Sequence, residues 1–479
     1  MARICIIGAG FAGHTAALYL GDKLGRGHQV TVINRSEKFV YIPSLVWVGI
    51  GRMDVAKTQF GLEQVYRKFN IRFITGRATA VHPDDQYVMA EPSGQPDQPV
   101  RIDYDYLLIA TGPKLDFEAT PGLGPAVGNT WSICSPPHAV DARDHYLEAV
   151  ARMQKGQSQR LVIGTGHGGA TCQGAALEYI TNVHKDLIRR GVRDRCQLTY
   201  LSNEPELGDF GIGGLKMKHK GRPTSAADFI GAVFKDYGIT AEVGRAVTAV
   251  EPGAISWQDM DGQEGTTGYD YAMLIPRFLG QPLEFIGAEG QDVAAKVINP
   301  VNKMVTVDGI YGLPYPELEK NPDAWPAVYQ NPNYANIFAA GIAFAPPGPI
   351  SRPHLNPNGL PQSPAPPRTG MVSGIIGRIV ALNIIDLVTK GRMTHSERMT
   401  EMAAACIASM GDSLWDGSAA VIMVYPVVPD RRRYPNEDGR DQFVTHMEMG
   451  LAGAWMKRMI HTTFMHKLQG RIGWKIIPE

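Results

Sequence analysis

The chain has 479 residues, of which 47 are Lys or Arg and 47 are Asp or Glu, so its formal net charge is zero. This length allows two or three domains, and the balanced charge provides no global basic field for nucleic-acid binding. Five scattered cysteines without a CxxC pair argue against a disulfide scaffold and a structural zinc site. We therefore expect a globular protein with no nucleic-acid partner and no metal.

The first predicted elements form a nucleotide-binding unit. An apolar run at residues 3–7 leads into a glycine turn at 8–13, an Ala- and Leu-rich segment and a second apolar run at 29–34. This order predicts a βαβ unit, in which the helix N-terminus holds a pyrophosphate. The three glycines permit the tight turn, the approach of the phosphates and close helix packing. The second strand ends in Asn34 instead of an acid, and an amide can still hydrogen-bond a ribose hydroxyl.

The start of the chain and its apolar segments bear on location. Because the first strand begins at residue 3, we expect no cleaved signal peptide, and the cytoplasmic side of the membrane is the default location. No uncharged apolar stretch reaches the roughly 18 residues of a spanning helix. The best candidate, residues 371–388, is interrupted by Arg378, Asn383 and Asp386, which predicts a buried amphipathic helix.

A second unit of the same kind begins at residue 159. Its glycine turn is 164–169, its predicted helix covers about 170–190, and its second strand is 197–201. Two such units in tandem indicate a flavoprotein with two dinucleotide-binding domains. The glycine pattern fits NAD formally. However, this strand ends in Leu201-Ser202-Asn203, with no acid at the residue that matches Asn34, and Cys172 occupies the first turns of the helix. These departures argue against NAD binding.

The remaining segments complete the predicted architecture, which is α/β with two Rossmann-like domains in tandem. A strand ending in Gly341 marks the return to the first domain, and residues 346–367, rich in Pro, Asn, Ser and Gly, predict a long irregular surface loop. The predicted domains are an FAD-binding domain, a second Rossmann-like domain with the redox cysteines, and a C-terminal region that interacts with quinone and membrane. Their ranges are 1–115 with 300–390, 116–299 and 391–479.

Six motifs along the chain carry a family resemblance. They are PSLVWVGIG at 43–51, YDYLLIATGPKL at 104–115, Cys134 with His138, GATCQGAA at 169–176, PRTG at 367–370 and CIASMGD at 406–412. In this order they resemble the sulfide:quinone oxidoreductase family, which is related to the flavin subunit of flavocytochrome c sulfide dehydrogenase. The resemblance implies an FAD enzyme that oxidises sulfide, or a related sulfur compound, and passes the electrons through cysteine and flavin to a membrane quinone.

The resemblance also implies roles for single residues. Cys172, near a helix N-terminus that favours a thiolate, becomes a redox thiol, although a buried, inert cysteine is the alternative. Cys134 becomes its sulfur partner or a covalent tether for FAD. His138 is a candidate proton shuttle, and Glu178 is a candidate proton acceptor near the flavin, unless it lies on a solvated helix face. Arg368 supports negative charge on the flavin. The expected cofactor-binding residues are Gly8, Gly10, Phe11, Ala12, Gly13, Asn34, Arg35, Ala110, Thr111, Gly112, Gly341, Ile342, Arg368, Thr369 and Gly370.

Three departures from the family pattern concern the sulfur chemistry. The third cysteine of such enzymes is expected at Ala343, a second histidine is expected at Asp209, and the loop after Ala343 is longer than the family norm. The other cysteines, Cys5, Cys196 and Cys406, are interpreted as structural. With Ala343 in place of a thiol, Cys406 is the likeliest spare partner.

The C-terminal segment 451–468 predicts an amphipathic helix at a membrane surface. Its apolar face would consist of Trp455, Met456, Met459, Ile460, Phe464 and Leu468, with Lys457, Arg458, His461 and Lys467 largely elsewhere. A helix docked on its own domain is the alternative, and access to a lipid-soluble quinone favours the membrane. We thus expect a peripheral membrane protein and allow for a homo-oligomer. Rival functions are an NADH:quinone or other NAD-dependent flavin reductase, a flavin subunit serving a cytochrome, and a scaffold without turnover.

Overall fold

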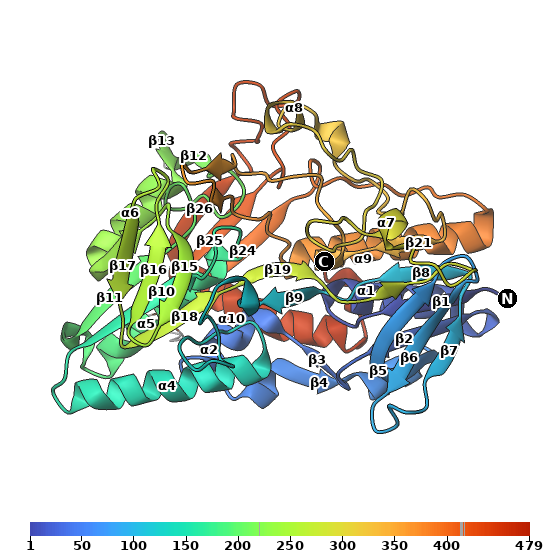
Figure 1. Cartoon of the computed structure of the whole chain (residues 1–479), viewed down its shortest axis with the longest axis horizontal. Helices are drawn as coiled ribbons and strands as arrows, with labels where there is room; N and C mark the ends of the chain where they lie inside the picture. The colour runs from blue at the N-terminus through green and yellow to red at the C-terminus, as the bar shows by residue number, and fades with distance from the viewer. Residues whose placement is uncertain (220, 412–414, 416) are drawn as a thin grey trace.

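The computed structural model describes residues 1–219, 221–411, 415 and 417–479. Figure 1 shows two sheet-containing bodies side by side, with the C-terminal strands and helix lying against both. Asp412, the last residue of the predicted motif at 406–412, lies outside the described residues.

The first body is built on a sheet with strand order β21-β8-β1-β2-β5-β6-β7, and β20 also pairs with β5. The strands from β21 to β5 are parallel. Parallel strands are covered on both faces, which explains the nearly continuous apolar sequences of β1, β8 and β21 at the centre and one edge of the sheet. Their bounds are β1 (Arg3–Ile7), β2 (Gln29–Asn34), β5 (Ile71–His82), β6 (Tyr87–Pro92), β7 (Val100–Asp103), β8 (Tyr106–Ile109), β20 (Glu284–Phe285) and β21 (Ile337–Ala339).

Helices α1 (Phe11–Leu24) and α9 (Gly370–Lys390) pack against each other in this body. Their contact is close, because a Cβ added at Gly377 would lie 2.2 Å from the carbonyl oxygen of Ala12. Among the described residues, α9 is the one helix long and apolar enough to cross a membrane, and 67% of its most apolar window is buried inside the protein. Smaller elements are β3 (Lys38–Val40), α2 (Leu45–Val48), β4 (Gln59–Gly61), α3 (Leu62–Lys68), α7 (Ala294–Val297) and α8 (Tyr315–Leu318).

The second body contains a parallel sheet in the order β14-β11-β10-β18, which is the second predicted Rossmann-like unit. An antiparallel sheet, β15-β16-β17, and the hairpin β12-β13 accompany it. Its helices are α4 (Pro136–Gln154), α5 (Gln173–Arg189) and α6 (Ala226–Tyr237). Its strands are β10 (Gln159–Thr165), β11 (Cys196–Leu201), β12 (Lys216–His219), β13 (Arg222–Ser225), β14 (Ile239–Glu242), β15 (Ala246–Glu251), β16 (Ala254–Gln258), β17 (Glu264–Gly268) and β18 (Tyr271–Ile275).

The two connections between the bodies run side by side as the antiparallel pair β9 (Pro113–Asp116) and β19 (Arg277–Gly280), visible at the centre of Figure 1. Because β20 already pairs with β5, the chain returns to the first sheet by residue 284, earlier than the predicted boundary at 300. The ion pair between the partly exposed Arg277 and the buried Asp116, at 2.6 Å, ties the two connections together.

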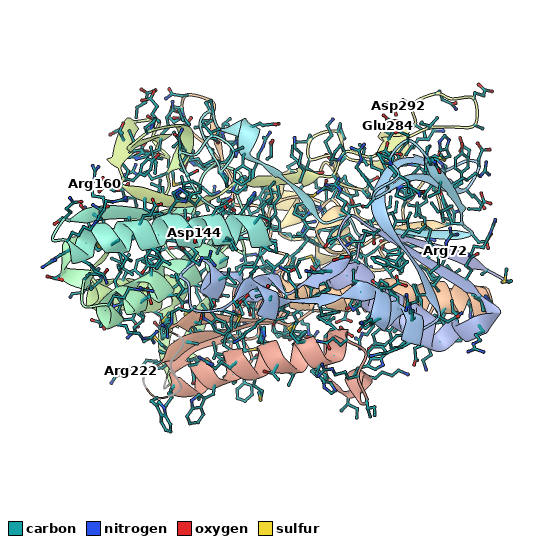
Figure 2. All side chains as sticks on the ribbon, turned by 90° about the horizontal axis from the view of Figure 1, so that it is seen from below. Arg72, Asp144, Arg160, Arg222, Glu284 and Asp292 are labelled. Atoms are coloured by element: carbon teal, nitrogen blue, oxygen red, sulfur yellow. The ribbon has the colours of Figure 1, made fainter. Side chains whose placement is uncertain are left out.

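The C-terminal region is a three-stranded antiparallel sheet, β24 (Ala404–Met410), β25 (Ser418–Val424) and β26 (His446–Gly450), followed by helix α10 (Leu451–Leu468). Strand β24 packs on α5, and α10 covers β24 and β25. In Figure 2, α10 runs along one edge of the molecule, with Arg222 beyond one of its ends. The region therefore contributes one long helix at the surface and a sheet that contacts the predicted redox helix.

Candidate active site

The first glycine turn joins β1 to α1 at the carboxyl edge of the first sheet. Gly8 has a φ of +103°, and an added Cβ would lie 2.2 Å from the carbonyl oxygen of Ala110. A Cβ at Gly13 would lie 2.0 Å from the carbonyl oxygen of Gly8. By contrast, a Cβ at Gly10, the residue that caps α1, would meet nothing within 4 Å. The turn is closed where it packs and open where the free N–H groups of α1 can meet a phosphate.

Other predicted cofactor residues surround the same opening. Gly112 also borders open space, and its φ is +66°. The backbone N–H of Ala9 donates to Oδ1 of Asn34 at 3.0 Å, so this side chain braces the turn as well as ending β2. Arg35 is exposed and donates to Oε1 of Gln281 at 3.0 Å. At Gly341, where φ is +67°, an added Cβ would lie 3.1 Å from the Ala12 Cβ.

The N-terminus of α9 packs against the start of α1, where a Cβ at Gly370 would lie 3.1 Å from the Phe11 ring. Arg368 donates to the carbonyl oxygen of Phe344, and its guanidinium lies 5.0 Å from the centre of the Phe344 ring. Burial lowers the pKa of Arg368 to about 10. Nε of Arg368 and Oγ1 of Thr369 are buried and have no hydrogen-bond partner among the described residues. Buried donors without partners indicate a polar ligand. These groups and the open turn at Gly10 therefore fit FAD.

Cys172 is the residue that caps the N-terminus of α5, immediately before the helix. Its backbone is left-handed, with φ at 67° and ψ at 32°, which is uncommon for a residue other than glycine. Burial raises the pKa of its thiol to about 12; Cys134 raises the pKa further, and Thr171 and Arg368 lower it. Desolvation of the thiolate is thus the largest effect on this thiol in the folded chain, and the redox role of Cys172 stays a prediction.

Cys134 and His138 lie at the start of α4. The N–H of Cys134 donates to the Ser132 hydroxyl at 3.1 Å, and burial raises the pKa of its thiol to about 11. Ser135 caps α4 and accepts from the backbone N–H of His138 at 3.4 Å. Burial lowers the pKa of His138, whose buried Nδ1 has no hydrogen-bond partner in the described part of the chain. A neutral imidazole with one nitrogen unused can accept or donate a proton.

Glu178 is buried on α5, not on a solvated helix face, with 5% of its surface exposed. Its Oε1 accepts from the Ser409 hydroxyl at 2.6 Å and from Nζ of Lys457 at 2.9 Å. Lys457 is also buried and donates to the carbonyl oxygen of Ile407 at 2.8 Å. This ion pair joins α5, β24 and α10. The role of Glu178 as a proton acceptor stays a prediction.

The pattern of α10 also differs from the predicted helical wheel. Lys457 and Lys467, assigned to a polar face, are buried, and Lys467 pairs with Glu479 at 2.8 Å. Trp455 and Met459 are instead 51% and 57% exposed. Lys457 is held inside by the buried carboxylate of Glu178, and Lys467 by that of Glu479. The helical pattern of α10 alone does not show these partners.

The second glycine turn is filled by the chain itself. A Cβ at Gly168 would lie 2.3 Å from the carbonyl oxygen of Pro361. The N–H of Ser363 donates to the carbonyl oxygen of Gly168 at 2.9 Å, and the N–H of Ala365 donates to that of Ala170 at 3.1 Å. The predicted surface loop thus docks on the turn through backbone hydrogen bonds, because its backbone groups find partners there.

The rest of this loop anchors the docked segment on the second body. It contains the short hairpin β22 (His354–Leu355) and β23 (Pro361–Gln362). Gln362 donates to the carbonyl oxygen of Gln258 at 3.0 Å, and Asn356 donates to the side chain of Gln258, also at 3.0 Å. Gln362 and Asn356 are each 3% exposed. The loop therefore lies at the surface, with Leu355 65% exposed, and is anchored to the second body by Asn356 and Gln362.

Asn203 fills the turn from within. Its amide donates to the carbonyl oxygen of Gly168 at 2.9 Å and to that of Ala170 at 3.2 Å, and its Oδ1 accepts from Gln173 at 2.9 Å. The residue is 1% exposed. These hydrogen bonds hold the Asn203 side chain on the second turn, as the hydrogen bonds of Asn34 to Ala9 and Ser36 hold that side chain on the first. The sequence showed the missing acid, but not that an amide there would tie the turn together.

Asp209, at the position of the expected histidine, is buried and accepts from the hydroxyl of Ser351. The nearby Glu204 was not among the predicted site residues, although burial raises its pKa to about 7. Asp209 lines a cavity of about 730 Å³, together with Arg352 and Arg440. A burial effect of this kind depends on the fold and leaves no local signal in the sequence.

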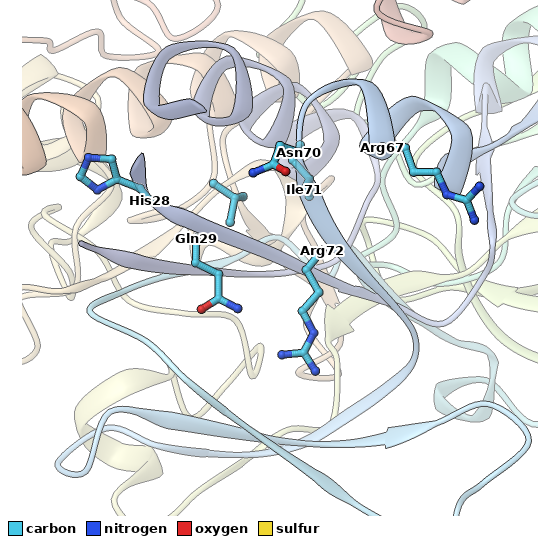
Figure 3. A pocket seen from close by; sticks show the side chains of 7 residues that line it. His28, Gln29, Arg67, Asn70, Ile71 and Arg72 are labelled. Atoms are coloured by element: carbon cyan, nitrogen blue, oxygen red, sulfur yellow. The ribbon is translucent and has the colours of Figure 1, made fainter. Parts of the chain in front are cut away.

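A smaller pocket, of about 410 Å³, lies elsewhere in the first body. It is lined by residues from the amino ends of β2 and β5, including His28 and Arg72 (Figure 3). The glycine turn after β1 lies at the opposite edge of this sheet. The pocket is therefore separate from the predicted FAD-binding residues around Gly10 and the N-terminus of α9. Among the described residues, no group of three or more His, Cys, Asp or Glu side chains could hold a metal.

The chain is similar to known flavoprotein oxidoreductases in both sequence and structure. The family model of pyridine nucleotide-disulphide oxidoreductases matches residues 2–184. Sulfide-quinone reductase of Aquifex aeolicus is 29% identical over 438 residues, which cover 91% of this chain and 87% of that protein. The X-ray structure of the sulfide:quinone oxidoreductase from A. aeolicus superposes with a TM-score of 0.77 at 26% identity, covering 98% of this chain and 92% of that chain.

NADH-dependent relatives are similar over less of the sequence. A type II NADH:quinone oxidoreductase of Haemophilus influenzae is 31% identical over 130 residues, covering 26% of this chain and 29% of that protein. The structure of NDH2 from Plasmodium falciparum in complex with NADH has a TM-score of 0.66 at 13% identity, covering 99% of this chain and 97% of that chain, and shares the fold alone.

The two Rossmann-like units, the open glycine turn and the family match define an FAD-dependent flavoprotein oxidoreductase. The predicted fold class and the predicted cofactor are thereby confirmed. Within this class, the resemblance to the sulfide:quinone oxidoreductase family is confirmed over nearly the whole chain. The chain departs from the predicted pattern at residue 343, where alanine stands in place of the expected thiol.

Proposed function

We propose that this protein oxidises sulfide, or a related sulfur compound, and delivers the electrons to a membrane quinone. The observation that carries the proposal is that the second glycine turn is occupied by the chain's own residues. A thiol, Cys172, caps the helix where a dinucleotide would rest, and the segment 361–365 fills the glycine turn. The surroundings of α5 thus favour sulfur chemistry over pyridine-nucleotide binding.

The residues that would hold FAD are those around Gly10, Gly112, Gly341 and the N-terminus of α9. When bound, FAD supplies a two-electron acceptor that can also pass electrons on singly. Arg368 supports negative charge on it, and Cys172 lies close enough to Arg368 for each to influence the pKa of the other. His138 and Glu178 are the candidates for holding and moving protons.

The rival function, NADH-dependent flavin reduction, has support from the partial similarity to type II NADH:quinone oxidoreductases. It requires the second glycine turn to accept a pyrophosphate. The hydrogen bonds of Ser363 and Ala365 to this turn, and the buried amide of Asn203, stand in the way. The sulfur function requires no such opening.

The proposed location is the membrane surface, through α10. Trp455 and Met459, one helical turn apart, are both more than half exposed, and Arg458 lies between them in sequence and is exposed as well. An exposed apolar pair beside a cation suits the interface of a lipid bilayer. This surface would bring the protein to its quinone; the side of the membrane stays a prediction.

Cys134 has two proposed roles, as a sulfur partner of Cys172 or as a covalent tether for FAD. Acid precipitation of the purified holoprotein separates them. A tether retains the flavin absorbance in the protein pellet, and Cys134→Ser releases it to the supernatant. Flavin that is released from the wild type excludes the tether and leaves the sulfur role.

Steady-state turnover tests the proposed function. Reduction of a soluble ubiquinone analogue is followed by absorbance with hydrosulfide as the electron donor, and in parallel with NADH. We expect turnover with hydrosulfide and none with NADH. Turnover with NADH alone would establish the rival.

A further inference from the structure

The chain folds back onto the first body after α10. In residues 469–479, which we call the C-terminal strap, Trp474 is buried, and its ring contacts those of Tyr19 on α1 and Phe69, with centroids 5.0 and 5.9 Å apart. A Cβ at Gly470 would lie 2.4 Å from the Phe69 ring. In Figure 1 the C-terminal end of the chain lies beside α9. The strap therefore ties α10 to the helices of the FAD-binding body.

The strap ends in a buried ion pair. Nζ of Lys467, in the last turn of α10, lies 2.8 Å from Oε1 of Glu479 and donates to the carbonyl oxygen of Ile477 at 2.6 Å. The side chains of Lys467 and Glu479 are 1% and 3% exposed. Burial and the charge of Glu479 raise the pKa of the Tyr19 hydroxyl to about 12. Because an unpaired buried charge is costly, each member of the pair holds the other in place.

The carboxylate of Glu479 occupies a notch between α1 and α9. A Cβ added at Gly374 of α9 would lie 3.2 Å from Oε2 of Glu479 and 3.8 Å from Oγ1 of Thr15 of α1. The strap thus places a side chain where α9 itself carries none. Gly374 lies four residues after Gly370, or about 6 Å along the helix axis. The end of the strap is therefore one helical turn from a predicted FAD-binding residue.

The two helices meet closely where the predicted FAD-binding residues lie. A Cβ at Gly377 would lie 2.2 Å from the carbonyl oxygen of Ala12, and one at Gly341 would lie 3.1 Å from the Ala12 Cβ. Gly370 packs on the Phe11 ring in the same way. Such contacts leave the helices little freedom, since closely packed interiors transmit displacements. A shift at the notch would therefore move the N-termini of α1 and α9 relative to each other.

We propose that the C-terminal strap positions the two helix N-termini that hold FAD, and that Glu479 and Lys467 are positioning residues in this strap. Bound FAD and the docked strap then stabilise each other, because coupling between two sites is reciprocal. Since the strap continues α10, FAD also fixes the end of the helix that carries Trp455 and Met459. The inference concerns cofactor binding and holds whichever electron donor the protein uses.

Hydrogen exchange tests one direction of the coupling. Exchange of peptides from 469–479 is compared in the purified holoprotein, after removal of FAD and after FAD is added back, all in Cys134→Ser so that the flavin cannot be tethered. We expect exchange across the strap to become at least about tenfold faster without FAD and to slow again with it. Peptides of α6, in the second body, are the control, and their exchange should not change. Equal protection of the strap in all three samples would overturn the proposal.

Variants of the ion pair test the other direction. Glu479→Gln and Lys467→Met each leave one buried charge unpaired, so the dissociation constant of FAD should rise at least about fivefold. The double variant removes both charges and should recover part of this loss. Lys475→Met is the matched control, because Lys475 belongs to the strap but its pair with Asp22 is partly exposed, and it should bind FAD as the parent does. Fluorescence of the FAD released on dilution measures all four.

Deletion of residues 470–479 covers the case in which a single variant fails to fold. Its far-ultraviolet circular dichroism should match that of the parent, and its dissociation constant for FAD should again rise at least about fivefold. If the deletion and the folded single variants bind FAD as tightly as Lys475→Met does, the strap has no part in FAD binding and the proposal fails. That failure leaves the proposed function untouched, because neither hydrosulfide nor NADH enters the experiment.

Discussion

Cys172 combines a reactive group with an unfavourable backbone. A left-handed conformation costs a residue with a Cβ on the order of 1 kcal/mol, and such strain tends to occur at functional sites. The sequence motif identified this thiol, but it placed Cys172 inside the helix instead of at its cap. Helix boundaries depend on which backbone groups find partners, and here the docked loop supplies some of those partners.

Because the backbone at Cys172 is left-handed, substitutions at this residue can distinguish its chemical role from its effect on stability. Cys172→Gly, Cys172→Ala and Cys172→Ser should all lose flavin reduction by hydrosulfide, by about a hundredfold or more. The glycine variant should be about 1 kcal/mol more stable than the alanine variant, because glycine adopts positive φ without a penalty. Anaerobic absorbance spectroscopy and urea denaturation measure the two effects. Undiminished flavin reduction in these variants would remove Cys172 from the mechanism.

At the scale of elements, α1 is tied to the end of α10 through one buried histidine. The two ring nitrogens of His14 bond the Tyr66 hydroxyl at 2.9 Å and the carbonyl oxygen of Leu468 at 2.6 Å. Burial lowers the pKa of His14 to about 4. The contact joins residues separated by more than four hundred positions, which no local pattern predicts.

His14 should make stability depend on pH. The unfolded chain binds a proton at His14 below its ordinary pKa of 6.5, while the folded protein does so only below about 4. Stability is therefore lost as the pH falls from 6.5 to 4, by about 3 kcal/mol. His14→Gln should lack this component, so its stability deficit relative to the wild type should shrink by that amount. Denaturation at several pH values measures it, and a constant deficit would contradict the assignment.

The docked loop is the second feature at this scale. Its composition predicted an irregular segment, and this part of the prediction holds for most of 346–367. The place where the loop docks was not predictable, because the backbone hydrogen bond between Ser363 and Gly168 requires no particular side chain. For the same reason, the sequence does not predict that the second glycine turn is filled.

Adjacent glycines give a matched test of the docking. The Cβ of Gly168→Ala would meet the Pro361 carbonyl oxygen at 2.3 Å, so the loop must move. At Gly169→Ala the nearest atom is Nδ1 of His167, at 3.4 Å, an ordinary contact. We expect faster hydrogen exchange across residues 354–366 in the first variant only. Equal exchange in both variants would show that the loop does not rest on the turn.

At the scale of the whole molecule, the order of elements was largely predictable. Glycine turns and apolar runs located both Rossmann-like units, since these signals are local and periodic. The ion pair between Glu178 and Lys457 was not predictable. It buries Lys457, which the predicted helical wheel placed on the polar side of α10. Long-range pairing of buried charges overrides a helical wheel, because an unpaired buried charge is costly.

Membrane association should depend on the exposed face of α10. Replacing Trp455 and Met459 together by Glu should abolish flotation with liposomes that contain anionic lipid, because two carboxylates would enter the interface. Val301→Glu, at an apolar residue that is 84% exposed and lies outside α10, is the control and should float as the wild type does. Retained flotation of the double variant would assign membrane binding to another surface.

Anaerobic stopped-flow absorbance of the bound flavin decides whether hydrosulfide or NADH is its electron donor. The purified holoprotein is mixed with hydrosulfide in one series and with NADH in the other, and the visible absorption band of the oxidised flavin is followed in both. We expect rapid bleaching by hydrosulfide, none by NADH, and recovery of the band when a soluble quinone is added. Rapid bleaching by NADH, with no response to hydrosulfide, would contradict it.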